Sequence, residues 1–201
     1  MSATCSRQLI VMARWPAPGR CKRRLASSLG AAAAARIQAR LTDHTLAVGR
    51  QLGIELVLAV DGLAPRAARR LGDQLGVGRI VLQGGGGLGA RMQRQFQRAA
   101  KERARRVVLI GSDLPQLERA DLASAFAALD HQQAVLGPAC DGGYWLIGLR
   151  RPEPALMEGI AWGSEQVLEQ TLAALARRGL KPALPPWRRD LDRGEDLGAW
   201  R

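Results

Sequence analysis

The chain has 201 residues, of which 47% are hydrophobic and 24% are charged, a composition typical of a globular domain. This length favours one domain over residues 1–201, with enough core to fold without a disulfide or metal staple. The net charge of +12 either reflects the base composition of the genome or marks an anionic partner, which could be a nucleotide, a nucleic acid or an acidic lipid. The chain has one tyrosine and no aromatic residues interleaved with its basic runs, which argues against nucleic acid as that partner.

Cysteine usage and hydropathy indicate the cellular setting. The three cysteines Cys5, Cys21 and Cys140 are odd in number and lack metal-binding spacing, which is typical of reduced thiols in a cytoplasmic protein. No apolar run is long enough to span a membrane. The apolar run near the start continues into a Pro/Gly loop, so it is interpreted as a strand and not as a signal peptide. The sequence leaves the oligomeric state open, and a homodimer is compatible with it.

Short apolar runs alternate with longer helical patterns along the chain. Strands are predicted over 8–13, 54–60, 79–82 and 106–110, and helices over 31–52, 65–75, 88–103 and 119–129. Two strands over 134–137 and 144–149 follow, then a helix over 164–177 and a short strand over 181–184. This order predicts an α/β fold: a mostly parallel twisted sheet with helices on both faces and a late antiparallel hairpin.

A stiff basic loop follows the first predicted strand. Two prolines and Gly19 restrict it, and it carries Arg14, Arg20, Lys22 and Arg24. Free N–H groups at a helix N-terminus together with cations attract phosphate. Basic residues at that position also oppose the helix dipole, which suggests a pyrophosphate as the partner. The alternative is a solvated basic turn.

A glycine run follows the third predicted strand. Gly84, Gly86 and Gly89 fit the G-x-G-x-x-G spacing, and a backbone this bare lets a nucleotide approach closely. Arg91 follows in the next helix. With Asp113 as a ribose-binding acid, the spacing is also typical of a dinucleotide-dependent dehydrogenase, although that fingerprint normally follows the first strand of its fold. A flexible loop without a ligand is the other alternative.

Ser112 and Asp113 follow the fourth predicted strand. Ligands of open parallel sheets lie beyond the carboxyl ends of the strands. A carboxylate beside a hydroxyl can hold Mg²⁺ or Mn²⁺ whose other ligands are phosphate oxygens and water. Asp113 is therefore the candidate catalytic metal ligand, and a turn or helix cap is the alternative.

The late hairpin carries Asp141, Gly142, Gly143 and Tyr144 between its strands. Asp-Gly alone is a strong turn signal, but a second glycine beside the chain's only tyrosine suggests a wall for a sugar or acceptor. Asp141 is the second catalytic candidate.

Two alternating acids lie near the end of the chain. Asp190 is a candidate metal ligand because an extended backbone would point it the same way as Asp192. Asp192 itself has Glu195 three positions on, which is the spacing of a helix capping box, so an N-cap role is preferred for it.

Six ordered segments resemble the rSAM/selenodomain-associated transferase 1 family: LIVMARWPAPGRCKRRLA, QGGGGLGARM, VLIGSDLPQL, LGPACDGGYWLIGL, IAWGS and DLDRGEDL. The resemblance implies a GT-A-type, Rossmann-like nucleotide-diphospho-sugar transferase fold with a Ser-Asp pair in place of the DxD metal motif. Lys22 and Arg24 match the family's basic pair, Asp113 its metal acid, and residues 141–144 its DGGY. Two positions depart from the family pattern: Arg23 replaces a threonine, and Gly87 replaces an acid.

The expected function is group transfer from a nucleotide-diphospho-sugar to an unknown acceptor by a glycosyltransferase-like enzyme with Mg²⁺ or Mn²⁺. The basic loop would grip the donor phosphates, the glycine run would lie against base or ribose, and Asp141 and Tyr144 would face the transferred group or acceptor. Nucleotidyl transfer from an NTP (guanylyl or another NMP) to a phosphorylated acceptor is the nearest alternative. A non-catalytic nucleotide-binding protein is another.

Overall fold

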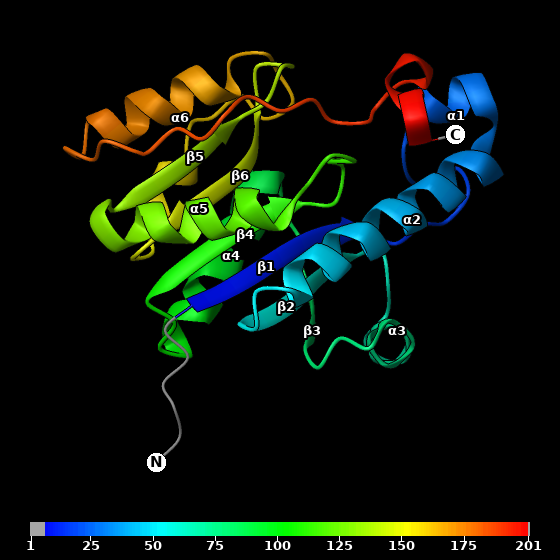
Figure 1. Ribbon diagram of the computed structural model, residues 1–201, viewed down its shortest axis with the longest axis horizontal. Coiled ribbons are helices and arrows are strands. Elements are labelled where there is room, and N and C mark those ends of the chain that lie inside the picture. Colours follow the sequence, from blue (N-terminus) through cyan, green and yellow to red (C-terminus); the bar gives the residue numbers. More distant parts are fainter. Residues whose placement is uncertain (1–6, 201) are drawn as a thin grey trace.

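A six-stranded sheet runs through the molecule, with helices on both of its faces (Figure 1). The computed structural model describes residues 7–200, so Cys5 lies outside the described residues. The strand order is β3-β2-β1-β4-β6-β5. The strands are β1 (Arg7–Arg14), β2 (Glu55–Asp61), β3 (Ile80–Leu82), β4 (Arg106–Gly111), β5 (Ala134–Pro138) and β6 (Tyr144–Leu149).

Strands β1 to β4 are parallel, and β6 is antiparallel to both β4 and β5. The mostly parallel sheet and the late antiparallel hairpin predicted from the sequence are therefore confirmed. The central strand β1 is buried along six of its eight residues, as expected for a parallel strand covered on both faces. Consecutive residues such as Leu9 and Ile10 pack into two different core clusters, one on each side of the sheet.

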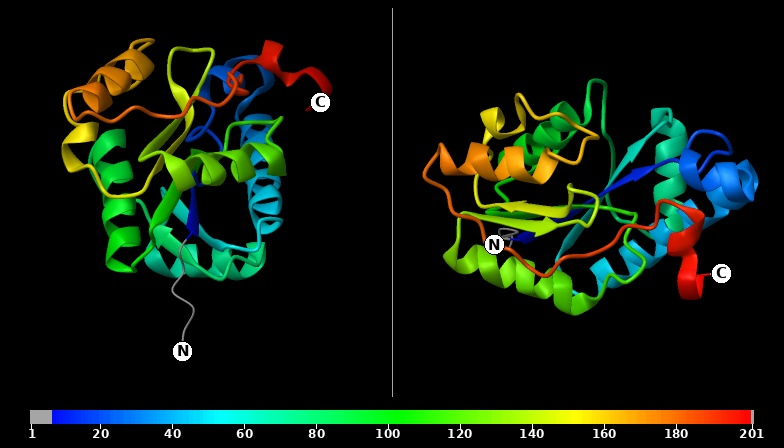
Figure 2. Two further views of the ribbon diagram at one scale, coloured as in Figure 1. Left: turned by 60° about the vertical axis from the view of Figure 1, so that its left-hand side comes forward. Right: turned by 90° about the horizontal axis from the view of Figure 1, so that it is seen from above.

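The helices divide between the two faces (Figure 2). Side chains of α2 (Ala31–Arg50) and α5 (Arg119–His131) pack in one core cluster. Side chains of α4 (Leu88–Lys101), α6 (Val167–Ala176) and the 3₁₀ helix η1 (Pro154–Met157) pack in the other. The remaining helices are α1 (Arg23–Leu29), α3 (Pro65–Leu75) and the 3₁₀ helix η2 (Gly194–Trp200). None of the helices within residues 7–200 meets the length and hydropathy of a membrane span.

The last segment of the chain differs from the predicted short strand over 181–184. Residues 181–192, named the C-terminal strap from here on, lie beside β5 and form only isolated bridges, at Ala183 and Arg188. The strap then crosses to α1, where η2 packs (Figure 1). Leu191 and Leu197 share a small buried cluster there with Leu25 and Leu41. The strap thus carries Asp190 from the β5 edge to the carboxyl ends of the central strands.

Candidate functional site

The topology gathers the predicted segments at one edge of the sheet. The parallel strands β1 to β4 end at this edge. Because β6 is antiparallel to β4 and to β5, the loop between β5 and β6 lies at the same edge. The basic loop, the glycine run, Asp113 and Asp141 therefore face one region, the usual location of ligands in open α/β sheets.

Lys22 and Asp113 form the central ion pair of this edge, with 2.6 Å between Lys22 Nζ and Asp113 Oδ1. The Lys22 side chain is only 5% exposed, and its ammonium also donates to the carbonyl oxygen of Leu191 at 2.5 Å. Lys22 has left-handed backbone angles (φ 46°, ψ 51°), which are uncommon for a residue other than glycine. Strained backbone of this kind is concentrated at functional sites.

Asp190 is within electrostatic range of other carboxylates. Burial and, to a smaller extent, the charges of Asp113, Asp141 and Asp192 together raise the pKa of Asp190 to about 7, while Lys22 acts in the opposite direction. Backbone contacts fix this arrangement, since the Leu191 N–H donates to the carbonyl oxygen of Asp113 at 2.9 Å. The ionised form of Asp190 therefore adds negative charge to a region that already holds other carboxylates and a single lysine.

Asp113 and Asp190 fit a site for a divalent cation whose other ligands come from a bound molecule and water. Within residues 7–200 no three His, Cys, Asp or Glu side chains are close enough to hold a metal ion by themselves. Asp113 and Asp190 supply hard oxygen donors, and Mg²⁺ is commonly bound by one or two carboxylates together with phosphates and water. A cation there would also stabilise the ionised form of Asp190.

The basic loop presents exposed cations beside this site. Gly19 has φ +77° and open space around it, and Arg20 is exposed. The Arg14 guanidinium lies 3.8 Å from Asp61 and donates to the carbonyl oxygen of Arg20 at 3.4 Å. Arg24 pairs with Asp192 at 2.9 Å on the surface.

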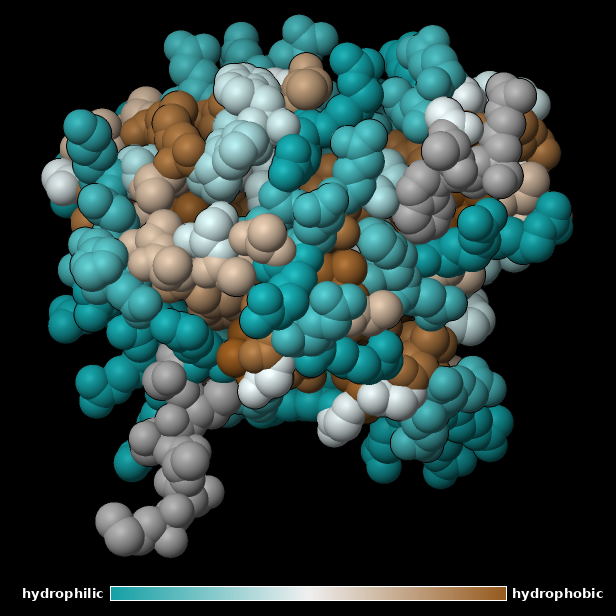
Figure 3. All heavy atoms as spheres, in the orientation of Figure 1, coloured by the Kyte–Doolittle hydropathy of each residue, from teal (hydrophilic) through white to brown (hydrophobic). Residues whose placement is uncertain are grey.

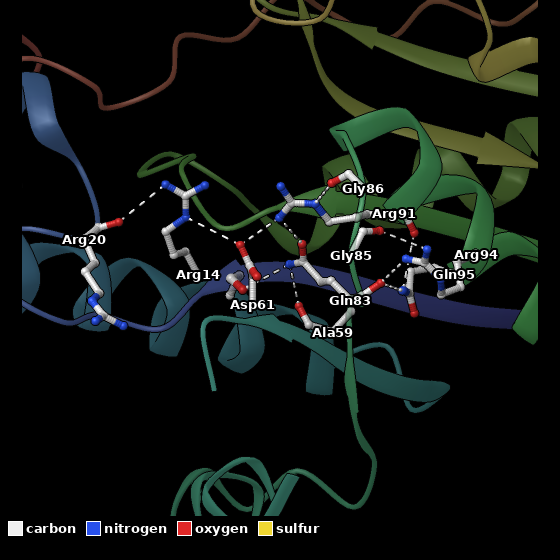
Figure 4. A network of polar contacts seen from close by, with 11 residues as sticks. Arg14, Arg20, Ala59, Asp61, Gln83, Gly85, Gly86, Arg91, Arg94 and Gln95 are labelled. Carbon is white, nitrogen blue, oxygen red and sulfur yellow. Dashed lines mark hydrogen bonds and ion pairs between the residues drawn. The ribbon is translucent and has the colours of Figure 1, made fainter. Parts of the chain in front are cut away.

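Asp61, at the end of β2, joins the basic loop to the glycine run and is a site residue that the sequence interpretation missed. Its carboxylate lies 2.7 Å from Arg91 Nη1, and Arg91 Nε donates to the carbonyl oxygen of Gly86 at 3.0 Å (Figure 4). The buried Gln83 amide donates to backbone carbonyls of β1 and β2. The signal was available, because Asp61 directly follows the second predicted strand and the same strand-end rule identified Asp113.

The three glycines of the predicted fingerprint divide into two groups. Gly84 and Gly86 are exposed and have φ of +80° and +95°, a conformation that glycine adopts readily. Gly89 is buried instead, and a Cβ there would lie 2.6 Å from Trp162 Nε1 and 2.8 Å from the Met157 carbonyl oxygen. The expectation that Gly89 contacts a nucleotide is therefore wrong, because this glycine permits close packing of α4 against η1.

The side chain of Ser112 does not face the site, although it is next to Asp113 in the sequence. Its side chain is 2% exposed, and its hydroxyl accepts a hydrogen bond from the buried Gln38 amide of α2 at 2.9 Å. The expected role of Ser112 in nucleotide binding is therefore corrected to a polar contact in the core beneath the site.

The DGGY segment is a longer loop than a two-residue turn. The Asp141 carboxylate accepts the Gly143 N–H at 2.9 Å, and Gly142 (φ +85°) packs directly against the backbone of Glu165. The Tyr144 and Trp162 rings pack edge to face, with 6.3 Å between their centroids. Its hydroxyl is buried, and burial raises the pKa of Tyr144. The expectation that Tyr144 faces an acceptor is wrong for this hydroxyl, whereas Asp141 is exposed.

The capping role expected for Asp192 belongs to another residue. The carboxylate that accepts the N–H groups of Asp192 and Arg193, at 3.1 and 2.7 Å, is that of Asp196. Asp192 pairs with Arg24 instead. The capping-box spacing predicted the wrong acid, because the chain does not begin an α-helix after Asp192 but a 3₁₀ helix at Gly194.

Comparison with known proteins extends these observations. The chain is similar to the solved structure of a putative nucleotide-diphospho-sugar transferase from Desulfovibrio desulfuricans G20, with 30% identity, a TM-score of 0.91, and coverage of 97% of this chain and 86% of that chain. The inositol-1-phosphate CTP transferase from T. maritima shares the fold at 16% identity, a TM-score of 0.59, and coverage of 98% and 93%.

A third similar structure is glucosyl-3-phosphoglycerate synthase from Mycobacterium tuberculosis, in complex with Mn²⁺, UDP and glucosyl-3-phosphoglycerate. It has 13% identity, a TM-score of 0.58, and coverage of 96% of this chain and 75% of that chain. No protein of curated function matches. The GT-A-type fold implied by the sequence resemblance is confirmed. Residues 44–164, more than half of the chain, match the family described as an uncharacterized protein conserved in bacteria (DUF2064), and the chain belongs to that family.

Proposed function

We propose that this chain is a metal-dependent, glycosyltransferase-like enzyme that uses a nucleotide-diphospho-sugar donor. The observation that carries the proposal is the convergence of Asp113, Asp190 and Asp141 at the carboxyl edge of the sheet, beside the buried ammonium of Lys22. Such a site has strong negative charge close to a fixed cation, and it suits a diphosphate bound together with a divalent cation.

Asp113 and Asp190 would hold the divalent cation, which would neutralise charge on the leaving nucleoside diphosphate. Arg14 and Arg20 would bind the outer phosphate oxygens, since exposed guanidinium groups make charge-assisted hydrogen bonds to phosphate. Lys22 is held by Asp113 and by the Leu191 carbonyl, so it would provide a positive charge that needs no reorganisation during the reaction.

The nucleoside would lie over the exposed backbone of Gly84 and Gly86, next to the Asp61–Arg91 pair. Asp141 is our candidate for the base that accepts the acceptor's hydroxyl proton. It is exposed, and its orientation is fixed by the Gly143 N–H. In this scheme the acceptor oxygen bonds to the sugar's anomeric carbon, and the bond from that carbon to the diphosphate oxygen breaks.

Two similar structures support this proposal. The relative from Desulfovibrio desulfuricans G20 is described as a putative nucleotide-diphospho-sugar transferase and matches at a TM-score of 0.91. The mycobacterial glucosyl-3-phosphoglycerate synthase was solved with Mn²⁺ and UDP. The CTP transferase with the same fold keeps nucleotidyl transfer as the competing activity.

The test is an incubation of the protein with Mn²⁺ and a panel of UDP-, GDP-, ADP- and CDP-sugars, with nucleoside diphosphate release as the measurement. We expect release from one donor class, lost in Asp190→Asn and retained in the matched surface variant Asp73→Asn on α3. Parallel incubations with NTPs and a sugar 1-phosphate measure pyrophosphate. Pyrophosphate without nucleoside diphosphate would establish nucleotidyl transfer, and binding heat without either product would indicate a non-catalytic nucleotide-binding protein. Either of these outcomes overturns the proposal, and so does the absence of both product and heat with every ligand.

A further inference from the structure

A cavity of about 1070 Å³ lies between α1, the first turns of α2 and the start of η2. Its lining includes Arg24, Ser28, Ala33 and Arg193. Of the residues assigned to the donor site, only Arg24 is among those that line it. These elements lie together at the upper right of Figure 1. The cavity is therefore a separate feature of the molecule.

The charge of this cavity is strongly positive. Four arginines line it (Arg24, Arg36, Arg40 and Arg193), against one acid, Glu195, and one of the four, Arg24, is paired with Asp192. Arg24 belongs to α1, Arg36 and Arg40 belong to α2, and Arg193 directly precedes η2, so the arginines come from separate segments of the chain. Arginine forks of this kind bind phosphate oxygens in pairs.

The beginning of α2 adds to this field. The helix has 20 residues, its N-cap Gly30 offers no side-chain cap, and its first turn carries no acid. The first amides of a helix have no partner within the helix, and its N-terminus carries partial positive charge. Ala33, in the first turn, lines the cavity, so an anion held by the arginines would lie near these amides.

Part of the cavity lining is apolar. Leu29 and Ile37 line it, and Leu29 is 41% exposed, one of the few large apolar side chains exposed in residues 7–200. Figure 3 shows apolar surface next to hydrophilic surface at the upper right, where α1 and the start of α2 lie. An inorganic anion alone would leave this apolar surface in water. A ligand with an apolar body would cover it.

We propose that this cavity is a second binding site, for a small phosphomonoester with an apolar body. The phosphate head is bound by the arginines and the α2 N-terminus, and the body lies on Leu29 and Ile37. Arg24 is the one residue that this site shares with the basic loop of the donor site. The proposal does not depend on the proposed transferase activity, so either can fail without the other.

The test is calorimetric titration of phenyl phosphate at about 50 mM salt, where charge contacts are only partly screened. We expect a dissociation constant below about 1 mM. The variant Arg36→Gln/Arg193→Gln should bind at least about tenfold more weakly. The matched control Arg66→Gln/Arg69→Gln removes the same charge from exposed positions on α3, and it should stay within about twofold of the parent. Thermal melts confirm that each variant is folded.

Two further ligands and one further variant locate the site. Inorganic phosphate should bind several-fold more weakly than phenyl phosphate, and benzyl alcohol should give no heat, because the site needs both head and body. Arg14→Gln/Arg20→Gln, in the basic loop, should leave phenyl phosphate affinity unchanged. The proposal is overturned if the parent protein gives no heat, if the cavity and α3 variants weaken binding equally, if the basic-loop variant abolishes binding, or if inorganic phosphate binds as tightly as phenyl phosphate.

Discussion

Replacing Asp190 by asparagine should stabilise the protein at pH 8 and have little effect near pH 4. The folded state raises the pKa of Asp190 from its ordinary value of 3.8 to about 7, through burial and the charges of Asp113 and Asp141. Between these two values the folded protein keeps a proton that the unfolded chain releases. Stability from this carboxyl is therefore lost as pH rises from about 4 to about 7, and the ionised form destabilises the fold above that range.

The size of the effect follows from the two pKa values. One pKa unit corresponds to about 1.4 kcal/mol. Between pH 5 and pH 8 the Asp190 carboxyl should therefore lower the free energy of unfolding by about 2.5 kcal/mol. Asparagine has nearly the same shape and does not titrate, so Asp190→Asn should lack this component of the pH dependence.

The measurement is urea unfolding of the parent and of Asp190→Asn at several pH values between 5 and 8, without divalent metal. The difference in unfolding free energy should grow by about 2.5 kcal/mol across that range. Asp73→Asn is the matched control, since Asp73 is exposed on α3 and is not among the charges that shift the pKa of Asp190; surface substitutions of this kind usually change stability by less than about 0.5 kcal/mol. A constant difference between parent and Asp190→Asn would refute the reasoning, because it would mean that Asp190 is not strained by its neighbours.

Substitutions of Asp113, Gly142 and Arg188, with comparison variants for the last two, test the site and its supports. Asp113→Asn should lower Mn²⁺-dependent nucleotide binding at least about 100-fold by calorimetry, because it removes a proposed metal ligand; unchanged binding would exclude Asp113 from the site. Gly142→Ala should lower the free energy of urea unfolding by about 2–4 kcal/mol, because its Cβ would lie 2.2 Å from the Glu165 carbonyl oxygen. Gly19→Ala, with φ +77° and open space around it, should lower it by about 1–2 kcal/mol. Equal costs would contradict the close contact between Gly142 and Glu165. Arg188→Gln breaks the 2.5 Å ion pair with Asp121, whose side chain is 7% exposed, and should lower the free energy of unfolding by about 1–3 kcal/mol. It should also weaken Mn²⁺-dependent nucleotide binding, because the strap is held less firmly, and Arg188→Lys should have a smaller effect. Unaltered binding would show that this ion pair does not position Asp190.

The sequence was informative where local patterns agree with the fold. The helix over 65–75 was predicted with its observed bounds, since a proline starts it and glycine ends it with φ +60°. The buried strands were found because continuous apolar runs are what a parallel strand needs on both faces. A helix start was expected at the basic residues, but its separation from α2 was not, because the break consists of the single residue Gly30 with φ 83°.

The candidate site was predicted in position more than in detail. Strand ends identified Asp113 because the carboxyl edge is fixed by topology. Which side chains face that edge depends on long-range packing, and periodicity does not report it. Ser112 contacts Gln38, 74 residues away in sequence, and Gly89 lies beneath Trp162. Neither contact has a local signal. The C-terminal strap likewise reaches the site through single backbone bridges, which carry no strand pattern.

Gly87, where the resembling family usually has an acid, stands at the N-cap of α4. Its backbone is extended (φ −66°, ψ 173°), and a Cβ there would meet nothing within 4 Å, so an aspartate would fit. An acid at an N-cap accepts helix N–H groups and favours the helix dipole. Gly87→Asp should therefore raise the unfolding free energy by about 1 kcal/mol and leave Mn²⁺ affinity unchanged. Mn²⁺ binding at least about tenfold tighter with unaltered stability would instead show that this position reaches the metal. On the capping interpretation, the glycine weakens the start of one helix, and Asp113 and Asp190 remain the complete carboxylate pair of the proposed metal site.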